Sequence, residues 1–116
     1  MKRDIDLIKT ILLKIEDFDT YNRPTSIDVS GVKENVIQYH LNLLLEENYI
    51  VAEKTGYQLV YPSRLTSKGH DFIDAAKNES IWNSAKEFLK NKGVTVTLDI
   101  VKDLLISSLK NHIGLK

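Results

Sequence analysis

The stretch YHLNLLLEENYI, residues 39–50, decides the fold because a helix ends within it and a β-hairpin begins at its last residue. Ile37, Leu41 and Leu44 recur at helical spacing, which predicts one buried face on a helix from about Lys33 to Asn48. Asn48 occupies the position where helices often end in a left-handed residue, a conformation that asparagine tolerates.

The residues after this helix have the pattern of two strands. Residues 50–54 (IVAEK) and 57–61 (YQLVY) flank Thr55-Gly56, which predicts two antiparallel strands joined by a turn at those two residues. A helix that runs directly into a two-stranded ribbon is the order in which a winged helix presents its third helix and its wing.

Apolar spacing predicts the remaining elements. Further helices are expected at about residues 3–17, 67–77, 81–92 and 98–112, a short strand at 25–29, and an extended link at 94–97. The interval 19–33 leaves room for one helical turn at most, so we expect no full scanning helix. The predicted fold class is mainly α with a small antiparallel β-hairpin (α+β), a winged helix with additional C-terminal helices. We expect a winged-helix domain at residues 1–78 and a helical extension at 79–116, packed on it as a single compact unit.

Composition excludes several classes of protein. The chain has 116 residues, 42% of them hydrophobic, and no cysteine, so disulfides and thiolate metal sites are absent. Apolar runs such as Leu43–Leu45 are far too short to span a bilayer. Asp4 and Asp6 fall where a secretory signal would be uncharged. These features predict a cytoplasmic protein without a membrane partner.

The charge balance bears on nucleic-acid binding. Lys plus Arg and Asp plus Glu both number 16, giving a formal net charge of zero. Through Leu65 there are eight basic and ten acidic residues, 8 − 10 = −2, and the rest of the chain has +2. A DNA-reading module usually has a basic excess, so this balance weakens the expectation of phosphate-driven binding.

The helix face opposite the buried leucines has several amide side chains. The residues predicted to point outward are Asn35, Gln38, Tyr39 and Asn42. Amides of Asn and Gln can pair bidentately with adenine, and a Tyr hydroxyl can reach a phosphate, which indicates a base-reading face. The alternative is a solvated polar face, since Glu34, Glu46 and Glu47 lie on or next to the same helix and would repel phosphate.

Basic residues around the hairpin are candidates for phosphate contacts. Lys54 and Tyr57 lie near the predicted wing tip, and the alternative is an ordinary polar hairpin end. The complete predicted DNA-binding set is Lys33, Asn35, Gln38, Tyr39, Asn42, Lys54, Tyr57, Arg64 and Lys68.

Motifs for catalysis and cofactors are missing from the sequence. There is no G-x-S-x-G, no phosphate-binding glycine loop and no H-E-x-x-H. His40 and His70 lie 70 − 40 = 30 residues apart on different predicted helices, so packed imidazoles are favoured over metal ligands. Asp71 and Asp74 are explained by helical ion pairing. We therefore expect no enzyme activity, no catalytic residues, no cofactor and no metal.

The last predicted helix is apolar along one face, with Leu105 and Leu109 at helical spacing. Core packing within the chain is one interpretation. Pairing with the same helix of a second copy is the other, because a two-fold axis would match a palindromic DNA site. A homodimer through the C-terminal helices is therefore a prediction.

Three segments together resemble a known family: MKRDIDLIKTILLKIE at residues 1–16, YHLNLLLEENYI at 39–50 and LTSKGHDFIDAAKNESIW at 65–82. The chain resembles a family of small uncharacterised bacterial proteins, common in prophages and other mobile elements and labelled as a domain of unknown function. The resemblance implies a winged-helix fold and a cytoplasmic bacterial setting, without an established activity. The central segment is also similar to the reading helix of compact transcription regulators, which implies that Gln38, Tyr39 and Asn42 face DNA.

Two functions remain open from the sequence. The first is a winged-helix protein that binds double-stranded DNA as a transcriptional or mobile-element regulator. The second is a protein–protein interaction adaptor with the same fold, which the neutral net charge and the helix glutamates favour. The sequence does not identify the DNA site, the protein partner or the effector.

Overall fold

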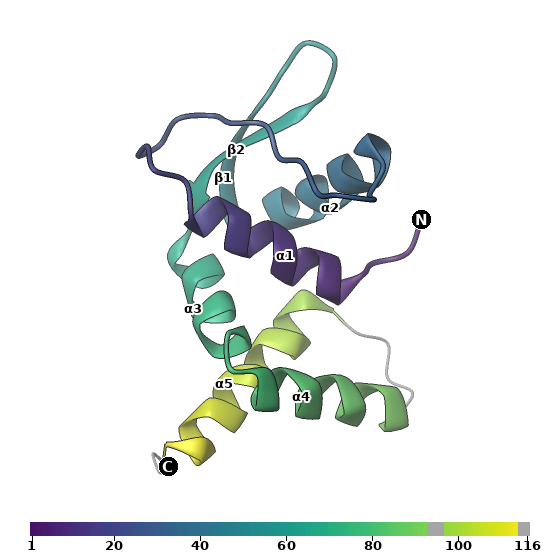
Figure 1. Ribbon diagram of the computed structural model, residues 1–116, viewed down its shortest axis with the longest axis vertical. Helices are drawn as coiled ribbons and strands as arrows, with labels where there is room; N and C mark the ends of the chain where they lie inside the picture. The colour runs from purple at the N-terminus through teal and green to yellow at the C-terminus, as the bar shows by residue number, and fades with distance from the viewer. Residues whose placement is uncertain (93–96, 114–116) are drawn as a thin grey trace. The chain divides into compact units, whose positions relative to one another are not determined.

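A computed structural model describes residues 1–92 and 97–113 of the chain (Figure 1). The elements in chain order are α1 (Ile5–Glu16), α2 (Glu34–Glu46), β1 (Ile50–Lys54), β2 (Val60–Leu65), α3 (Ser67–Ala76), α4 (Glu79–Lys92) and α5 (Leu98–His112). The fold is mainly helical with one two-stranded antiparallel sheet, which confirms the predicted α+β class. As predicted, no helix lies between α1 and α2. Most of the predicted link at 94–97 lies outside the described residues.

Contacts along the chain define two units, Met1–His70 and Asp71–Lys116. The division falls inside α3, eight residues before the boundary predicted at residue 78. The first unit holds α1, α2 and the hairpin, and the second holds α4 and α5.

The start of α1 is fixed by its own sequence. The Asp4 carboxylate accepts hydrogen bonds from the amides of Asp6 and Leu7, which would otherwise lack partners at the helix start. The helix therefore begins at Ile5, two residues later than predicted. Its predicted apolar stripe is buried almost throughout, and Ile8 is fully buried.

The end of α2 confirms the prediction for Asn48. Asn48 has a φ of 65°. Its amide donates to the Leu45 carbonyl at 3.2 Å, and the Tyr49 amide donates to the Leu44 carbonyl at 2.9 Å. This pair of bonds is the Schellman motif, which closes a helix and redirects the chain. Tyr49 itself is fully buried, so the turn feeds β1 directly from the core.

The hairpin forms with a different loop from the one predicted. Lys54 pairs with Val60, so the loop spans residues 55–59 instead of Thr55-Gly56 alone, and β2 begins at Val60 and not at Tyr57. The Thr55 hydroxyl accepts from the amides of Tyr57 and Leu59, each at 3.3 Å, which holds this longer loop in place.

The predicted strand at residues 25–29 is wrong. This segment has no strand assignment, although the Thr25 amide donates to the Pro62 carbonyl at 2.9 Å. Pro62 has no amide to return a second bond, so a regular ladder cannot extend along this edge of β2. The segment still contributes a side chain to the core, because Ile27 is only 6% exposed.

The start of α3 packs closely against the end of α2. The Thr66 hydroxyl accepts from the Gly69 amide at 3.1 Å, which confirms the predicted N-cap. A Cβ at Gly69 would overlap the Tyr49 carbonyl oxygen, so only glycine permits this approach. The same carbonyl accepts from the Thr66 amide at 3.1 Å, which joins the entry of the hairpin to its exit.

The second unit has its own apolar contacts. The Phe72 and Trp82 rings meet edge to face with centroids 6.3 Å apart, and Ile73, Val101 and Leu105 are fully buried. Asn78 caps α4 through the Ile81 amide, and Thr97 caps α5 through the Ile100 amide. Two apolar residues that the helical spacing predicted to face inward are exposed: Phe88, at 48%, and Ile113, at 58%.

Candidate nucleic-acid interface

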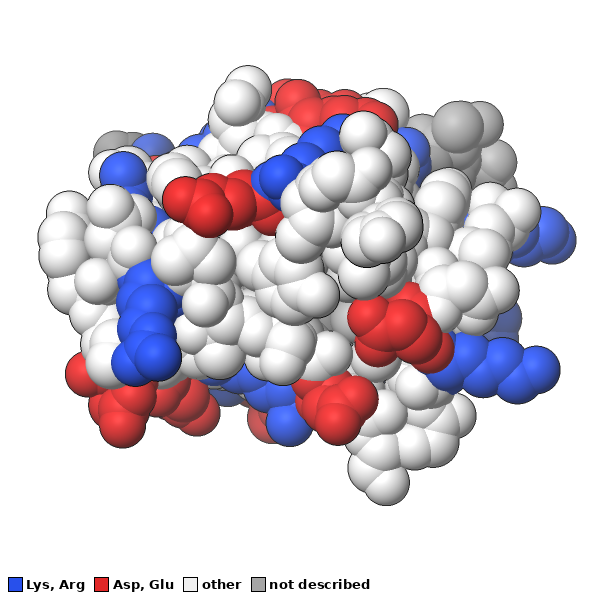
Figure 2. Space-filling view, turned by 90° about the horizontal axis from the view of Figure 1, so that it is seen from above, with Lys and Arg blue, Asp and Glu red and all other residues white. Residues whose placement is uncertain are grey.

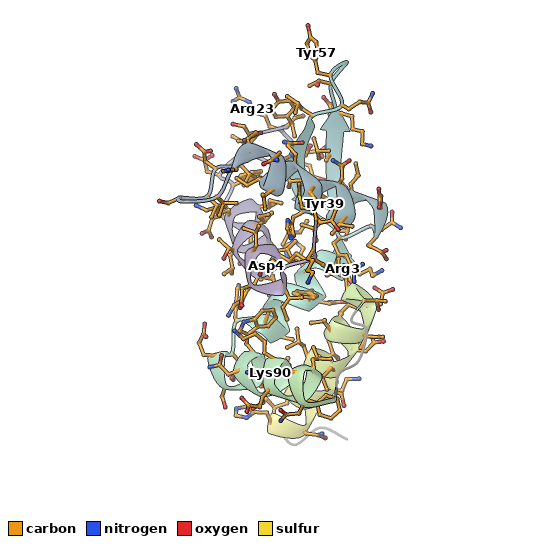
Figure 3. The ribbon with its side chains drawn as sticks, turned by 90° about the vertical axis from the view of Figure 1, so that its right-hand side faces the viewer. Arg3, Asp4, Arg23, Tyr39, Tyr57 and Lys90 are labelled. Atoms are coloured by element: carbon orange, nitrogen blue, oxygen red, sulfur yellow. The ribbon has the colours of Figure 1, made fainter. Side chains whose placement is uncertain are left out.

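The outer face of α2 is the first part of the predicted site. Lys33, which precedes the helix, and Asn35 are exposed, as predicted. Tyr39 and Asn42 are half-buried, with Tyr39 packed edge to face on the His40 ring at 5.2 Å. Figure 3 shows Tyr39 on α2. The outer face thus offers Lys33, Asn35 and Tyr39 as accessible polar groups.

Gln38 does not point outward as predicted. Its side-chain oxygen accepts from the Val60 amide at 2.7 Å, and its side-chain nitrogen donates to the Val60 carbonyl at 3.2 Å. The Gln38 amide therefore binds the edge of β2 as the peptide unit of a neighbouring strand would. It joins α2 to the hairpin at the first residue of β2. The side-chain nitrogen also lies 3.4 Å from a Glu34 carboxylate oxygen.

Asn42 is also bound within the protein. Its side-chain nitrogen donates to the Gln38 carbonyl at 2.9 Å, one helical turn earlier. A helical residue that bonds back to its own helix has less capacity for a base edge. The structure thus uses two of the three predicted base-reading amides, Gln38 and Asn42, in contacts inside the first unit.

The hairpin tip is the most accessible part of the predicted site. Tyr57 is 89% exposed and projects from the end of the hairpin (Figure 3), and Lys54 is exposed at the end of β1. The adjacent Gln58 adopts a φ of 64°, a left-handed conformation. In Figure 1 the loop between β1 and β2 extends well beyond α1 and α2. Within the first unit, the tip can therefore reach a partner that also contacts α2.

Arg64 and Lys68 make structural contacts. One Arg64 guanidinium nitrogen donates to the Leu65 carbonyl at 3.2 Å. The Lys68 ammonium donates to the Glu47 carbonyl at 3.0 Å and lies 4.6 Å from the centre of the Tyr49 ring. A cation at this place satisfies the carboxyl end of α2 and its dipole. Both predicted phosphate-binding cations therefore have contacts within the protein.

His40 is a positioning residue that the sequence pattern did not reveal. The buried imidazole accepts from the Asp4 amide at Nε2, 2.9 Å away, and its Nδ1 lies 2.8 Å from the Val36 carbonyl. Because an amide nitrogen can only donate, Nε2 is the acceptor in the contact with Asp4, which leaves Nδ1 to donate to the Val36 carbonyl. The imidazole joins α2 to the start of α1. Its partner lies 36 residues away, so helical spacing could not identify it.

The electrostatics of the first unit are close to balanced. Residues 1–70 contain nine basic and ten acidic side chains, a net charge of 9 − 10 = −1. Helix α2 has two glutamates and no Lys or Arg. On the face shown in Figure 2, basic and acidic side chains are interspersed and separated by uncharged ones. Basic residues do not form a continuous stripe on that face.

The described residues also bear on metal binding and on membrane insertion. Within residues 1–92 and 97–113, no three His, Cys, Asp or Glu side chains are grouped to hold a metal ion. None of the helices described has both the length and the apolar character needed to cross a bilayer.

Comparison with known proteins places the chain in a family. Residues 2–95 match the model of a family described as hypothetical protein (DUF2513). A Haemophilus influenzae protein described as uncharacterized is 32% identical over 108 residues, which cover 90% of this chain and 92% of the relative. No solved structure gives a significant match. The match extends over most of the sequence, and the chain therefore belongs to the DUF2513 family of hypothetical proteins.

Proposed function

We propose that residues 1–70 form a winged-helix module that binds double-stranded DNA, with α2 at a groove and the hairpin as the wing. The observation that carries this proposal is the bidentate contact between Gln38 and Val60, which fixes α2 to the hairpin. A reading helix and a wing must be held at a constant angle to engage neighbouring stretches of one duplex. The setting proposed is transcriptional or mobile-element regulation in a bacterial cytoplasm.

The contacts in the structure change which residues we propose to meet DNA. On α2, the exposed Asn35 and the half-buried Tyr39 are the uncharged residues that we propose to meet DNA, together with two exposed cations, Lys33 before the helix and Lys54 at the end of β1. We assign Tyr57, which is exposed, the role of inserting its ring or donating its hydroxyl at the wing. The remaining predicted residues, Gln38, Asn42, Arg64 and Lys68, form side-chain hydrogen bonds within the first unit and are left out of the proposed contact set.

The proposed contact residues predict weak DNA binding with a shallow dependence on salt concentration. Each phosphate neutralised contributes a slope of about −0.9 to the plot of log affinity against log salt concentration. Two exposed lysines, Lys33 and Lys54, therefore predict a slope of about −2 for one module. Sequence preference then depends on Asn35 and Tyr39, because phosphate contacts do not distinguish bases.

A fluorescence titration with genomic and upstream duplex DNA at about 50 mM salt tests the proposal, since phosphate contacts are strongest at low salt. The Lys54→Gln variant is expected to reduce the salt slope by about 1. Lys14→Gln is the matched control because Lys14 is exposed on α1, outside the proposed surface, and should leave the slope unchanged. No affinity at low salt, or equal effects of the two variants, contradicts DNA binding by this surface.

A protein-interaction adaptor is the second candidate. The absence of Lys and Arg from α2 favours it, as do two tyrosines, Tyr21 and Tyr57, that are 85% and 89% exposed. Exposed tyrosines are typical anchors of protein interfaces. The test is affinity capture with the wild-type chain and with Tyr57→Ala, before and after nuclease treatment. A partner that is still captured after nuclease treatment but is lost with Tyr57→Ala supports this role. A partner that is lost after nuclease treatment supports DNA binding instead.

A further inference from the structure

The first unit contains a pocket that the proposed DNA surface does not use. It has a volume of about 280 Å³ and is lined by the end of α1, the loop after it, β2 and the first turn of α3. All of its residues lie within 1–70. Ligand sites for drug-sized molecules usually measure roughly 300–1,000 Å³, so this pocket suits a small molecule.

A β-bulge forms one wall of the pocket. Ala52 pairs with Pro62 and Val51 pairs with Arg64, which leaves Ser63 as the extra residue in β2. Pro62 and Ser63 are consequently both buried, and the alternation of the strand is reset at Arg64. Bulges redirect side chains and are enriched beside functional sites. Here the bulge brings Ser63 and Arg64 to the same pocket.

Arg64 is the unusual group in this wall. It is half-buried, its Nε is buried with no hydrogen-bond partner, and one terminal nitrogen donates to the Leu65 carbonyl. No carboxylate of the described residues forms an ion pair with it. A buried guanidinium donor without an acceptor destabilises the fold, and a carboxylate matches the fork of Arg donors. Its buried Nε is closed to a ligand, so the terminal nitrogens of Arg64, which no carboxylate of the described residues pairs with, are the donors that a ligand in the pocket can bind.

Negatively charged side chains line the same pocket as the Arg64 cation. Glu16 and Asp19 both line it, and a Glu16 carboxylate oxygen lies 4.0 Å from Nδ1 of His70. Two carboxylates disfavour a phosphate or any ligand that carries only negative charge. They favour a ligand that also has an ammonium group. Ile15, Phe18 and Leu65 supply apolar surface for the rest of the molecule.

We propose that this pocket binds a free α-amino acid, with its carboxylate on Arg64 and its ammonium group on Asp19 and Glu16. One arginine and two carboxylates around a small, partly apolar pocket suit a zwitterion better than a plain anion or a plain amine. Ser63 and His70 both line the pocket, but no hydrogen bond joins them among the described residues. The contacts thus support binding and not acyl transfer. The inference is independent of DNA binding by α2.

The test uses the full chain labelled with ¹⁵N and each standard α-amino acid in turn at about 5 mM, which detects millimolar affinity. The best binder is compared with its N-acetyl derivative, its methyl ester and inorganic phosphate. We expect amide shifts at Ser63, Leu65 and His70, and roughly tenfold weaker binding when either charge of the ligand is removed. The proposal is overturned if none of the amino acids shifts these amides, or if phosphate is the preferred ligand.

Single substitutions test the cationic and the anionic side chains of the pocket separately. Arg64→Gln should weaken the binding of the best amino acid roughly tenfold. Asp19→Asn should have the same effect without changing a buried side chain, because Asp19 is exposed. Arg23→Gln is the matched control, since Arg23 is an exposed arginine outside the pocket lining. Unchanged affinity in Asp19→Asn and in folded Arg64→Gln, or an equal loss in Arg23→Gln, also overturns the proposal.

Discussion

Replacing Gln38 tests the contact that holds α2 to the hairpin. In Gln38→Ala, the Val60 amide and carbonyl both lose their side-chain partner. Val60 is fully buried, so these groups have little access to water. A buried amide without a partner destabilises a protein by about 1–3 kcal/mol, and the carbonyl adds less because it has a second lone pair. We therefore expect a loss of about 2–4 kcal/mol, a large fraction of the stability of a small domain.

Two measurements check this expectation. Urea unfolding gives the change in the free energy of unfolding, and hydrogen exchange of the Val60 amide reports on the contact itself. Asn35→Ala is the control on the same helix, because Asn35 is exposed and its loss should change stability by less than about 0.5 kcal/mol. If Gln38→Ala is as stable as this control and the Val60 amide remains equally protected, Gln38 does not hold the hairpin.

Three further predictions concern packing and assembly. Gly69→Ala should destabilise the protein by about 1–3 kcal/mol in urea unfolding, because its Cβ would overlap a main-chain carbonyl. Gly56→Ala, where a Cβ meets open space, should be nearly neutral, and equal effects would refute the close approach. His40→Leu fills the buried site with an apolar side chain but leaves the Asp4 amide without its acceptor, so a loss of about 1–3 kcal/mol is expected. A Leu variant as stable as the wild type would show that this bond contributes nothing. Analytical ultracentrifugation should show a homodimer that Leu109→Lys dissociates, since Leu109 is only half-buried on α5, and a wild-type monomer at all concentrations contradicts pairing through the C-terminal helices.

The helices and the order of the elements could be predicted because their signals are local. The buried face of α2 follows from the spacing of its leucines, and its end follows from Asn48 in the left-handed conformation. The N-cap at Thr66 likewise depends on a residue three positions away. Such signals are contained within one or two helical turns, so a single sequence is enough to detect them.

The hairpin shows where local signals mislead. Thr55-Gly56 has the composition of a tight turn, yet the Thr55 hydroxyl accepts hydrogen bonds from the amides of Tyr57 and Leu59. The loop therefore extends to Leu59. Gly56 is not among the residues with positive φ, whereas Gln58 is. The position of the turn was set by the side-chain contacts of Thr55 and by the pairing of Lys54 with Val60.

The candidate site was only partly predictable for a related reason. Spacing placed Gln38 near the outer side of α2, but it could not show a partner 22 residues away in β2. Residue type indicated that Arg64 and Lys68 could bind phosphate, but their contacts with the Leu65 and Glu47 carbonyls depend on the folded chain. Long-range hydrogen bonds decide which polar side chains remain accessible, and one sequence does not contain that information.

The most direct test of the central claim is an NMR titration of the full chain with duplex DNA at about 50 mM salt. DNA binding by α2 and the wing predicts that amide shifts gather at Lys33, Asn35 and Tyr39 and again at Lys54 and Tyr57. Shifts that fall elsewhere on the chain, or spectra that DNA leaves unchanged, would contradict it.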